Sequence, residues 1–174
     1  MLKYKIDKEL MEGTSIRVRP RILEQAIGFF LENHMMEDMV HGGEIIRDSR
    51  VYKNMRVDLK TEDTCIESKV LLSTWQSKGE TGFTRPSDLA ALLRYKGTVN
   101  MLLKHFKRVI LLVILQDGVI GQEEKGCLSA RLREAYQEEI CRGMEIWIAG
   151  LELQDDGIAL VDYHNETRVA GTME

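Results

Sequence analysis

A chain of 174 residues with 44% hydrophobic residues can bury one core of ordinary size, so we expect one domain. Its net charge of -4 excludes a strongly basic nucleic-acid coat, and its composition excludes an acidic disordered tail, so any nucleic-acid surface must be a local patch. The three cysteines, Cys65, Cys127 and Cys141, fit neither a disulfide framework nor a Cys-x-x-Cys zinc site and are expected as reduced thiols.

The sequence carries no signal for a membrane or for export. Its longest apolar run, from Val109 to Leu115, is far shorter than the roughly 20 residues that a membrane-spanning helix needs. The first ten residues lack the apolar centre and the small-residue cleavage site of a secretory signal. We therefore expect the protein in the cytoplasm.

The first half of the chain predicts one helix followed by a meander of strands. Residues 1–19 form an N-terminal arm, and Pro20 opens a segment whose apolar residues recur at helical spacing: Ile22, Leu23, Ala26, Ile27, Phe30 and Leu31. Three short extended runs then occupy residues 44–48, 55–60 and 64–70, with a polar turn between the last two. We expect these runs to pair as a small antiparallel meander.

The second half predicts helices and strands in alternation. A helix from about Ser87 to Phe106 precedes the apolar run 108–116, which is typical of a central, parallel strand covered on both faces. The core ends with a loop over residues 117–126, a helix over 128–141 that stops at Gly143, and a hairpin of residues 144–153 and 158–163 closed by an Asp-Gly turn.

This order of elements predicts an α/β fold, in which a mixed central sheet is flanked by helices. We assign residues 1–174 to one domain, with a core from 20 to 164 and a flexible tail from 165 to 174.

Two acids and one amine stand out in the meander. Glu67 and Lys69 are two residues apart on one predicted strand, so their side chains point to the same face, whereas Ser68 points away. If this strand pairs with the preceding one, Asp58 can lie beside Glu67. A hard cation such as Mg²⁺ or Mn²⁺ accepts carboxylate oxygens, and the backbone carbonyl of Ser68 could add a third ligand. Lys69 could then orient a water molecule or stabilise charge on a phosphate.

The same residues have a plain alternative. Exposed strand faces commonly carry glutamate and lysine as solvated cross-strand partners, and an Asp followed later by Glu-x-Lys also occurs by chance. The order helix, meander, helix, strand favours chemistry, because it is the arrangement of the restriction-endonuclease-like PD-(D/E)xK nucleases, with Asp58 and Glu67-x-Lys69 on the second and third meander strands.

Several segments resemble the nuclease-like core of the sugar fermentation stimulation (SfsA) family. The resemblance runs from about Arg21 to Tyr163 in consistent order and rests on residues 55–59, 65–69, 107–113, 132–136, 143–146 and 157–161. It implies a PD-(D/E)xK fold, a DNA or RNA nuclease activity, and Asp58, Glu67 and Lys69 as the catalytic set. Family members usually carry an N-terminal OB-like domain, whereas here only about twenty residues precede the first predicted helix.

The first helix of this nuclease class often contributes a carboxylate to the metal. Glu24 is the natural candidate in this chain, although Gln25 stands in better register with the family and binds metal poorly. The alternative is that Glu24 is simply solvated at the edge of the apolar stripe.

Basic residues supply candidate nucleic-acid contacts. Arg17, Arg19 and Arg21 alternate along the arm, which could follow phosphates or could protect an edge strand from unwanted pairing. Further candidates, in the meander and in the second helix, are Arg56, Arg94 and Lys96. The expected partner is DNA or RNA, and a homodimer could help the chain to reach a duplex. Two other classes remain open, a DNA-binding regulatory module without hydrolysis and a structural partner domain.

Overall fold

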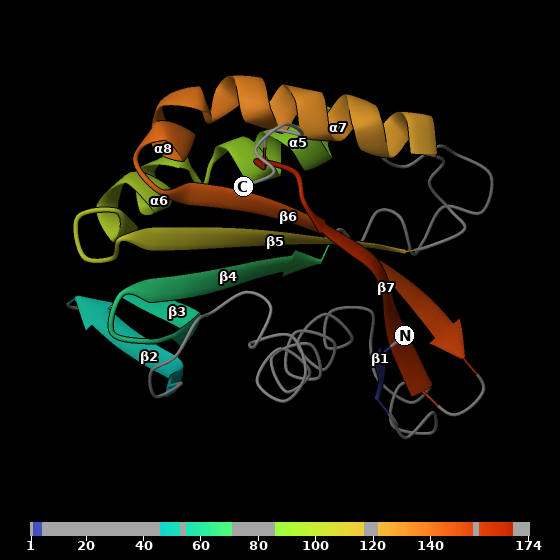
Figure 1. The fold of residues 1–174 in the computed structure, drawn as a ribbon, viewed down its shortest axis with the longest axis horizontal. Helices are drawn as coiled ribbons and strands as arrows, with labels where there is room; N and C mark the ends of the chain where they lie inside the picture. Colours follow the sequence, from blue (N-terminus) through green and yellow to red (C-terminus); the bar gives the residue numbers. More distant parts are fainter. Residues whose placement is uncertain are drawn as a thin grey trace, which may run out of the picture.

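A seven-stranded mixed sheet is the framework of the structure, a computed structural model that describes residues 2–4, 46–52, 55–70, 86–116, 122–154 and 157–168. The strands lie in the order β1-β7-β6-β5-β4-β3-β2 (Figure 1). Their bounds are β1 Leu2–Tyr4, β2 Ile46–Tyr52, β3 Met55–Lys60, β4 Thr64–Val70, β5 Arg108–Gln116, β6 Met144–Gln154 and β7 Gly157–Asn165. The predicted α/β architecture is confirmed at this level.

Strand β5 is the central strand of the sheet, as its continuous apolar sequence predicts. It runs parallel to β4 on one side and to β6 on the other. Every side chain from Val109 to Leu115 is at most 1% exposed. An uninterrupted Val, Ile and Leu run is the composition that a strand buried on both faces requires.

The meander is antiparallel, as predicted, and it brings β4 beside β5. β2 pairs with β3 and β3 pairs with β4 in antiparallel register. The bounds of β3 and β4 agree with the sequence, whereas the run predicted at 44–48 is observed as β2 from Ile46 to Tyr52. In the turn between β3 and β4, the Thr61 N–H donates to the Thr64 carbonyl over 2.7 Å. The side chain of Asp63 accepts hydrogen bonds from both threonine hydroxyls, which fixes the turn.

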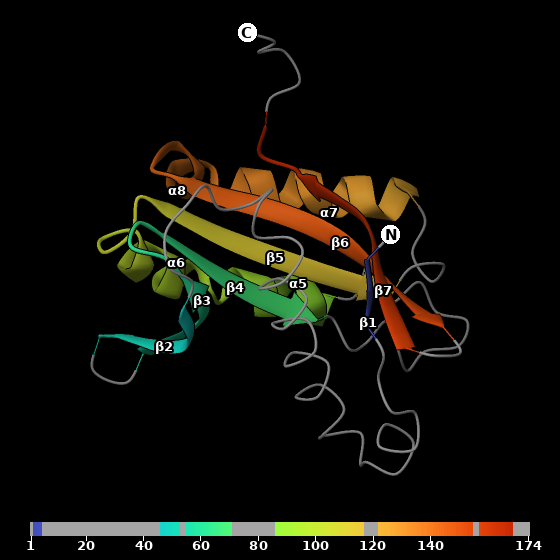
Figure 2. The ribbon, with the colours of Figure 1, turned by 60° about the horizontal axis from the view of Figure 1, so that its bottom comes forward.

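Four helices cover one face of this sheet: α5 Pro86–Leu93, α6 Lys96–Leu102, α7 Gln122–Ala135 and α8 Gln137–Cys141 (Figures 1 and 2). The prediction of one continuous helix over 87–106 is wrong, because the chain turns at Arg94 and Tyr95. The predicted helix over 128–141 is likewise interrupted, at Tyr136, and α7 starts inside the predicted loop at 117–126. Gly126 lies inside α7 and is exposed, and a helix tolerates an exposed glycine at a cost of about 1 kcal/mol.

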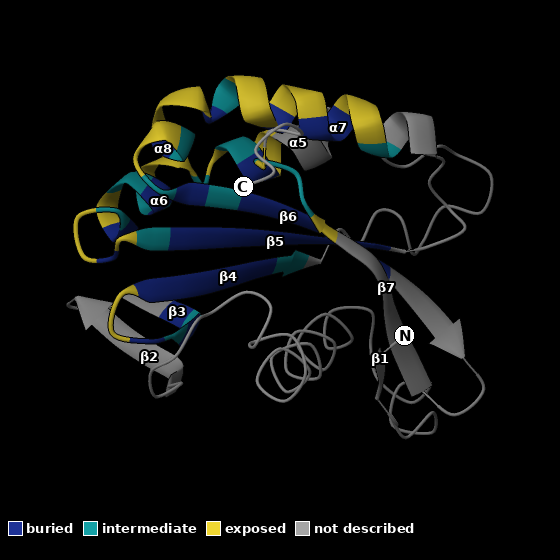
Figure 3. Cartoon of the chain, viewed as in Figure 1, coloured by how far each residue is buried: buried dark blue, intermediate teal, exposed yellow. Residues whose placement is uncertain are grey.

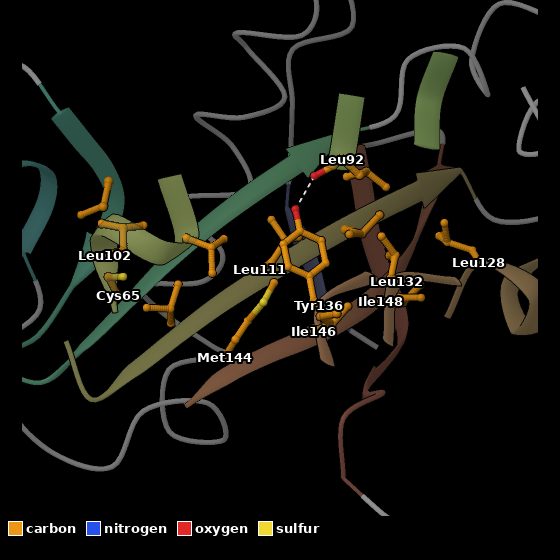
Figure 4. Packing of buried hydrophobic residues seen from close by; sticks show 14 of the residues in the cluster. Cys65, Leu92, Leu102, Leu111, Leu128, Leu132, Tyr136, Met144, Ile146 and Ile148 are labelled. Carbon is orange, nitrogen blue, oxygen red and sulfur yellow. Dashed lines mark hydrogen bonds between the residues drawn. The ribbon is translucent and has the colours of Figure 1, made fainter. Parts of the chain in front are cut away.

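The main core lies between the helices and the sheet. Alternate residues of β5 and β6 point to this side and pack against apolar side chains of the helices. Figure 4 shows the cluster, with Tyr136 near its centre; its labelled members are Cys65, Leu92, Leu102, Leu111, Leu128, Leu132, Tyr136, Met144, Ile146 and Ile148. The intervening residues on the second face of the sheet, Ile66, Ile110, Leu112 and Ile114, are also buried (Figure 3).

Strands β6 and β7 form the predicted hairpin, which pairs from Trp147 with Asn165 to Gln154 with Gly157. One strand was not predicted. Residues 2–4 of the expected N-terminal arm form β1, which pairs with β7. The tail predicted to fray also contains an ordered residue, because the Glu166 N–H donates to the Ile146 carbonyl and its carboxylate accepts a hydrogen bond from Ser129.

Other predictions lie outside the described residues. They are the first helix from Pro20 with Glu24, the arginines at 17, 19 and 21, and the tail from 169 to 174. The assignment of the chain to one domain also stays a prediction. Within the described segments, no helix is both long and apolar enough to cross a membrane.

Candidate metal and catalytic site

Glu67 and Lys69 lie on the face of β4 that the helices cover. Cys65, two residues before Glu67, belongs to the core cluster on that face. The Lys69 ammonium lies over the ring of Tyr95, with Nζ 4.5 Å from the ring centroid. Tyr95 occupies the turn between α5 and α6, so the helix layer meets the strand at this lysine. The shared face is what the alternation of a strand predicts.

The charge of Glu67 also affects the pKa of the Cys65 thiol on this face. Burial, and after it the negative charge of Glu67, raise the pKa of the Cys65 thiol well above its usual value. The carboxylate of Glu67 is itself buried, at 8% exposed. A buried carboxylate near a neutral thiol is held in a low-dielectric setting, where a cation would interact with it strongly.

Asp58 lies across the seam between β3 and β4. Among the described residues, the two strands pair at Leu59 with Ile66 and at Lys60 with Cys65. The Asp58 Oδ2 accepts two hydrogen bonds from Ser68, one from its backbone N–H over 2.7 Å and one from its hydroxyl over 2.9 Å. A side-chain carboxylate thus binds the N–H of Ser68, and it fixes Asp58 beside the residue that follows Glu67.

The oxygen atoms near this seam suit a hard cation. In a strand, the N–H and C=O of one residue point toward the same neighbour, so the Ser68 carbonyl faces β3 as its N–H does. Two carboxylates and a carbonyl are ligands that Mg²⁺ or Mn²⁺ would accept. Among the described residues, no group of three Asp, Glu, His or Cys side chains could hold a metal ion alone. Of the predicted metal ligands, only Asp58 and Glu67 are carboxylates within the described residues. The predicted site therefore also needs the Ser68 carbonyl, water and Glu24.

The residues predicted to contact nucleic acid differ in how far they are engaged with the rest of the protein. Arg94 is exposed in the turn between α5 and α6. The Lys96 ammonium donates to the Ala135 carbonyl over 2.8 Å and lies 3.7 Å from the Glu139 carboxylate, so it is engaged within the helix layer. Arg56 is in β3, but its side chain is not among those described. The role of each in binding stays a prediction.

Tyr95 is the residue near the site that the sequence did not indicate. It was expected inside a continuous helix, where nothing distinguished it from other aromatic residues. Its position depends on the turn at 94–95, which in turn depends on how the helices pack. A hollow on the surface lined by Glu62, Asp63, His105 and Lys107 lies at the start of β4, at the end of the strand away from Lys69, and is separate from the site.

Comparison with known proteins gives one informative result. No protein-family model matches the chain, and no curated protein matches it. Among solved structures, it resembles the structure of Pyrococcus furiosus SfsA in complex with Ca²⁺, with a TM-score of 0.50 and 19% identity. The match covers 82% of this chain. The fold is SfsA-like.

The likeness to SfsA concerns the fold and not the chemistry, because the sequences differ at most positions. The chain spans 63% of the length of the SfsA chain that it matches. The SfsA-like fold predicted from the resemblance is therefore supported, whereas the nuclease type and the roles of individual residues need their own argument.

Proposed function

We propose that this chain is a divalent-metal-dependent nuclease of the SfsA type, with a PD-(D/E)xK site, that hydrolyses phosphodiester bonds in DNA or RNA. The observation that carries the proposal is the seam of β3 and β4, where Asp58 is fixed beside Ser68 while Glu67 and Lys69 share the adjoining face. The SfsA-like fold supports it, as does the Ca²⁺ in the SfsA structure, since calcium is also a hard, oxygen-binding cation.

In this proposal, Asp58, Glu67 and the Ser68 carbonyl hold Mg²⁺ or Mn²⁺, with Glu24 as a further ligand. The bound metal would polarise a phosphate oxygen and lower the pKa of a water molecule. The donor set fits this role because every member is an oxygen. The Asp58 Oδ2 takes both hydrogen bonds from Ser68, and among the described residues no hydrogen bond to Oδ1 is found, so Oδ1 can face the cation.

Lys69 then acts on the reacting groups. Its ammonium can orient the attacking water or stabilise the negative charge that develops on the phosphate. Arg56, Arg94 and Lys96, with the arginines at 17, 19 and 21, are the proposed phosphate contacts, and a homodimer would allow both strands of a duplex to be reached. All three cysteines are free, as expected of a protein that works in the cytoplasm.

A second candidate is a DNA-binding regulatory module that keeps the fold but does not hydrolyse. The burial of Glu67, at 8% exposed, favours this candidate because a metal ion bound at a buried carboxylate is harder for substrate phosphates to reach. A cleavage assay separates the two functions.

The assay incubates single- and double-stranded DNA and RNA with the full chain in Mg²⁺ or Mn²⁺, and then with a chelator. We expect cleavage that needs the metal and that falls roughly 10²–10³-fold in Lys69→Ala, because a donor to the developing charge is removed. Asp58→Asn and Glu67→Gln should also lose activity.

Lys104→Ala and Glu138→Gln are the matched controls, since both side chains are exposed in the helix layer away from the seam. They should cleave like the parent protein. Cleavage that survives chelation would exclude the metal mechanism, and undiminished cleavage by Lys69→Ala would exclude the proposed role of Lys69. Salt-sensitive binding with no cleavage under any condition would favour the regulatory module.

A further inference from the structure

The two interruptions in the helix layer face each other. Helices α5 and α6 are separated at Arg94 and Tyr95, and α7 and α8 are separated at Tyr136. The Tyr136 hydroxyl donates to the Leu92 carbonyl over 2.5 Å (Figure 4, dashed line). In the other direction, the Lys96 ammonium donates to the Ala135 carbonyl over 2.8 Å. Residues at or beside one interruption are thus hydrogen-bonded to residues at or beside the other.

These bonds fix the turn that carries Tyr95. The Tyr95 N–H donates to the Leu92 carbonyl, the same oxygen that accepts the Tyr136 hydroxyl, and the Tyr95 carbonyl accepts the N–H of Val99. Deeper in the layer, Asn100 donates to the Glu139 carboxylate over 2.8 Å, which links α6 to α8. The backbone of Tyr95 is therefore held on both sides, and its ring projects over the end of β4.

The ring lies against the ammonium of Lys69 on β4, with Nζ 4.5 Å from the ring centroid. A cation over an aromatic face is attracted by the negative charge density of the ring. A lysine side chain has four rotatable bonds, so an ammonium without a fixed neighbour would sample many positions. An aromatic ring anchored by its own backbone can restrict that motion and leave the amine charged.

We propose that Tyr95 is a positioning residue that holds the Lys69 ammonium at the seam of β3 and β4 through its aromatic face. The claim that this affects catalysis rests on the proposed nuclease function, but the position of the amine can be measured without it. Because the contact is with the aromatic face of the ring, Tyr95→Phe should keep the function and a non-aromatic residue should lose it.

The first measurement is NMR of the full chain after reductive methylation with ¹³C, which labels lysines and keeps their charge. Lys69→Arg identifies the Lys69 signal. We expect the ring to shift this signal upfield in the parent protein and in Tyr95→Phe, and we expect the shift to disappear in Tyr95→Leu. Tyr95→Met serves as a second non-aromatic variant in case the leucine variant does not fold, as judged by its thermal transition.

The second measurement is steady-state cleavage in Mn²⁺. Tyr95→Leu should lower kcat roughly three- to thirty-fold with little change in KM, and Tyr95→Phe should restore kcat. An unshifted Lys69 signal in the parent protein, or an equal shift in the folded leucine and methionine variants, would overturn the inference. If neither the parent protein nor any variant cleaves, but the Lys69 signal is shifted only when residue 95 is aromatic, the proposed function fails and the positioning contact stands.

Discussion

Gly143 allows two loops at one end of the sheet to touch. Its φ of +114° lies in the left-handed region that only glycine enters readily. A Cβ at this position would lie 2.1 Å from the Lys107 carbonyl oxygen, a distance at which the backbone has to move. The residue follows the last helix, as the sequence predicts for a helix stop, and its carbonyl accepts the N–H of Val109 at the start of β5.

Replacing this glycine tests that contact. We expect Gly143→Ala to lower the free energy of unfolding by about 2–5 kcal/mol, from backbone strain and from the clash with Lys107. Gly126→Ala is the control, because its Cβ would meet nothing within 4 Å in helix α7. That change should stabilise the protein by about 0.5–1 kcal/mol. Denaturant unfolding measures both, and equal effects would show that the contact is unimportant.

At the scale of elements, Glu139 joins helix α6 to helix α8. Its side chain is 1% exposed, and its carboxylate accepts a hydrogen bond from Asn100, which Arg142 also contacts. Burial is the largest influence on its pKa and would raise it, but the bonds and the charges of Lys96 and Arg142 hold the pKa of Glu139 below its usual value. The folded protein therefore favours the ionised form.

The lowered pKa gives a definite sign to the pH dependence. A carboxyl group with a lowered pKa in the folded state stabilises the protein above the unfolded value of 4.5, and this contribution is lost as the pH falls through the folded pKa. We expect Glu139→Gln to cost about 1–2 kcal/mol at pH 7 and progressively less in acid.

The neighbouring Glu138→Gln is the control for this change, because Glu138 is exposed on the same helix. It should alter the unfolding free energy by less than about 0.5 kcal/mol at either pH. Unfolding curves at pH 7 and in acid give the comparison. A Glu139→Gln penalty that stays constant across this range would show that the charge of Glu139 contributes nothing to stability.

The elements differ in how well the sequence predicts them. Strands β3, β4 and β5 were predicted to the residue because their patterns are local: a polar turn between two extended runs, and a continuous apolar run. The interruptions of the helices were not, because they are fixed by contacts between distant residues, such as Tyr136 with Leu92, which are 44 positions apart. The start of α7 was missed because residues 117–126 contain three glycines, which favour a loop, although the helix begins at Gln122.

In the candidate site, too, some features follow from the local sequence and others from contacts between residues far apart in the chain. The period of a strand is enough to place Glu67 and Lys69 on one face. The bonds from Ser68 to Asp58 depend on the register between two strands, and the ring of Tyr95 depends on the packing of the helix layer on the sheet. Sequence reasoning therefore reached the acids and the amine, but not the aromatic ring that lies against the amine.

At the scale of the whole molecule, the order of strands determines which elements flank β4. Strand β3 pairs with β4 on one side, while β5 and β6 extend the sheet on the other side. On the β3 side, pairing begins at the turn of residues 61–63, and the Asp58 carboxylate binds Ser68 of β4. The fold of the chain is SfsA-like, with a match over 82% of its length.

The central claim is that Asp58, Glu67 and Ser68 form one metal site. The most direct test is a crystal structure of the full chain soaked in Mn²⁺, with the ion located by its anomalous scattering and with Asp58→Asn crystals as the control. We predict a peak bound by both carboxylates and the Ser68 carbonyl, lost in the variant. Mn²⁺ bound only elsewhere, or carboxylates of Asp58 and Glu67 that face different sides of the sheet, would contradict the claim.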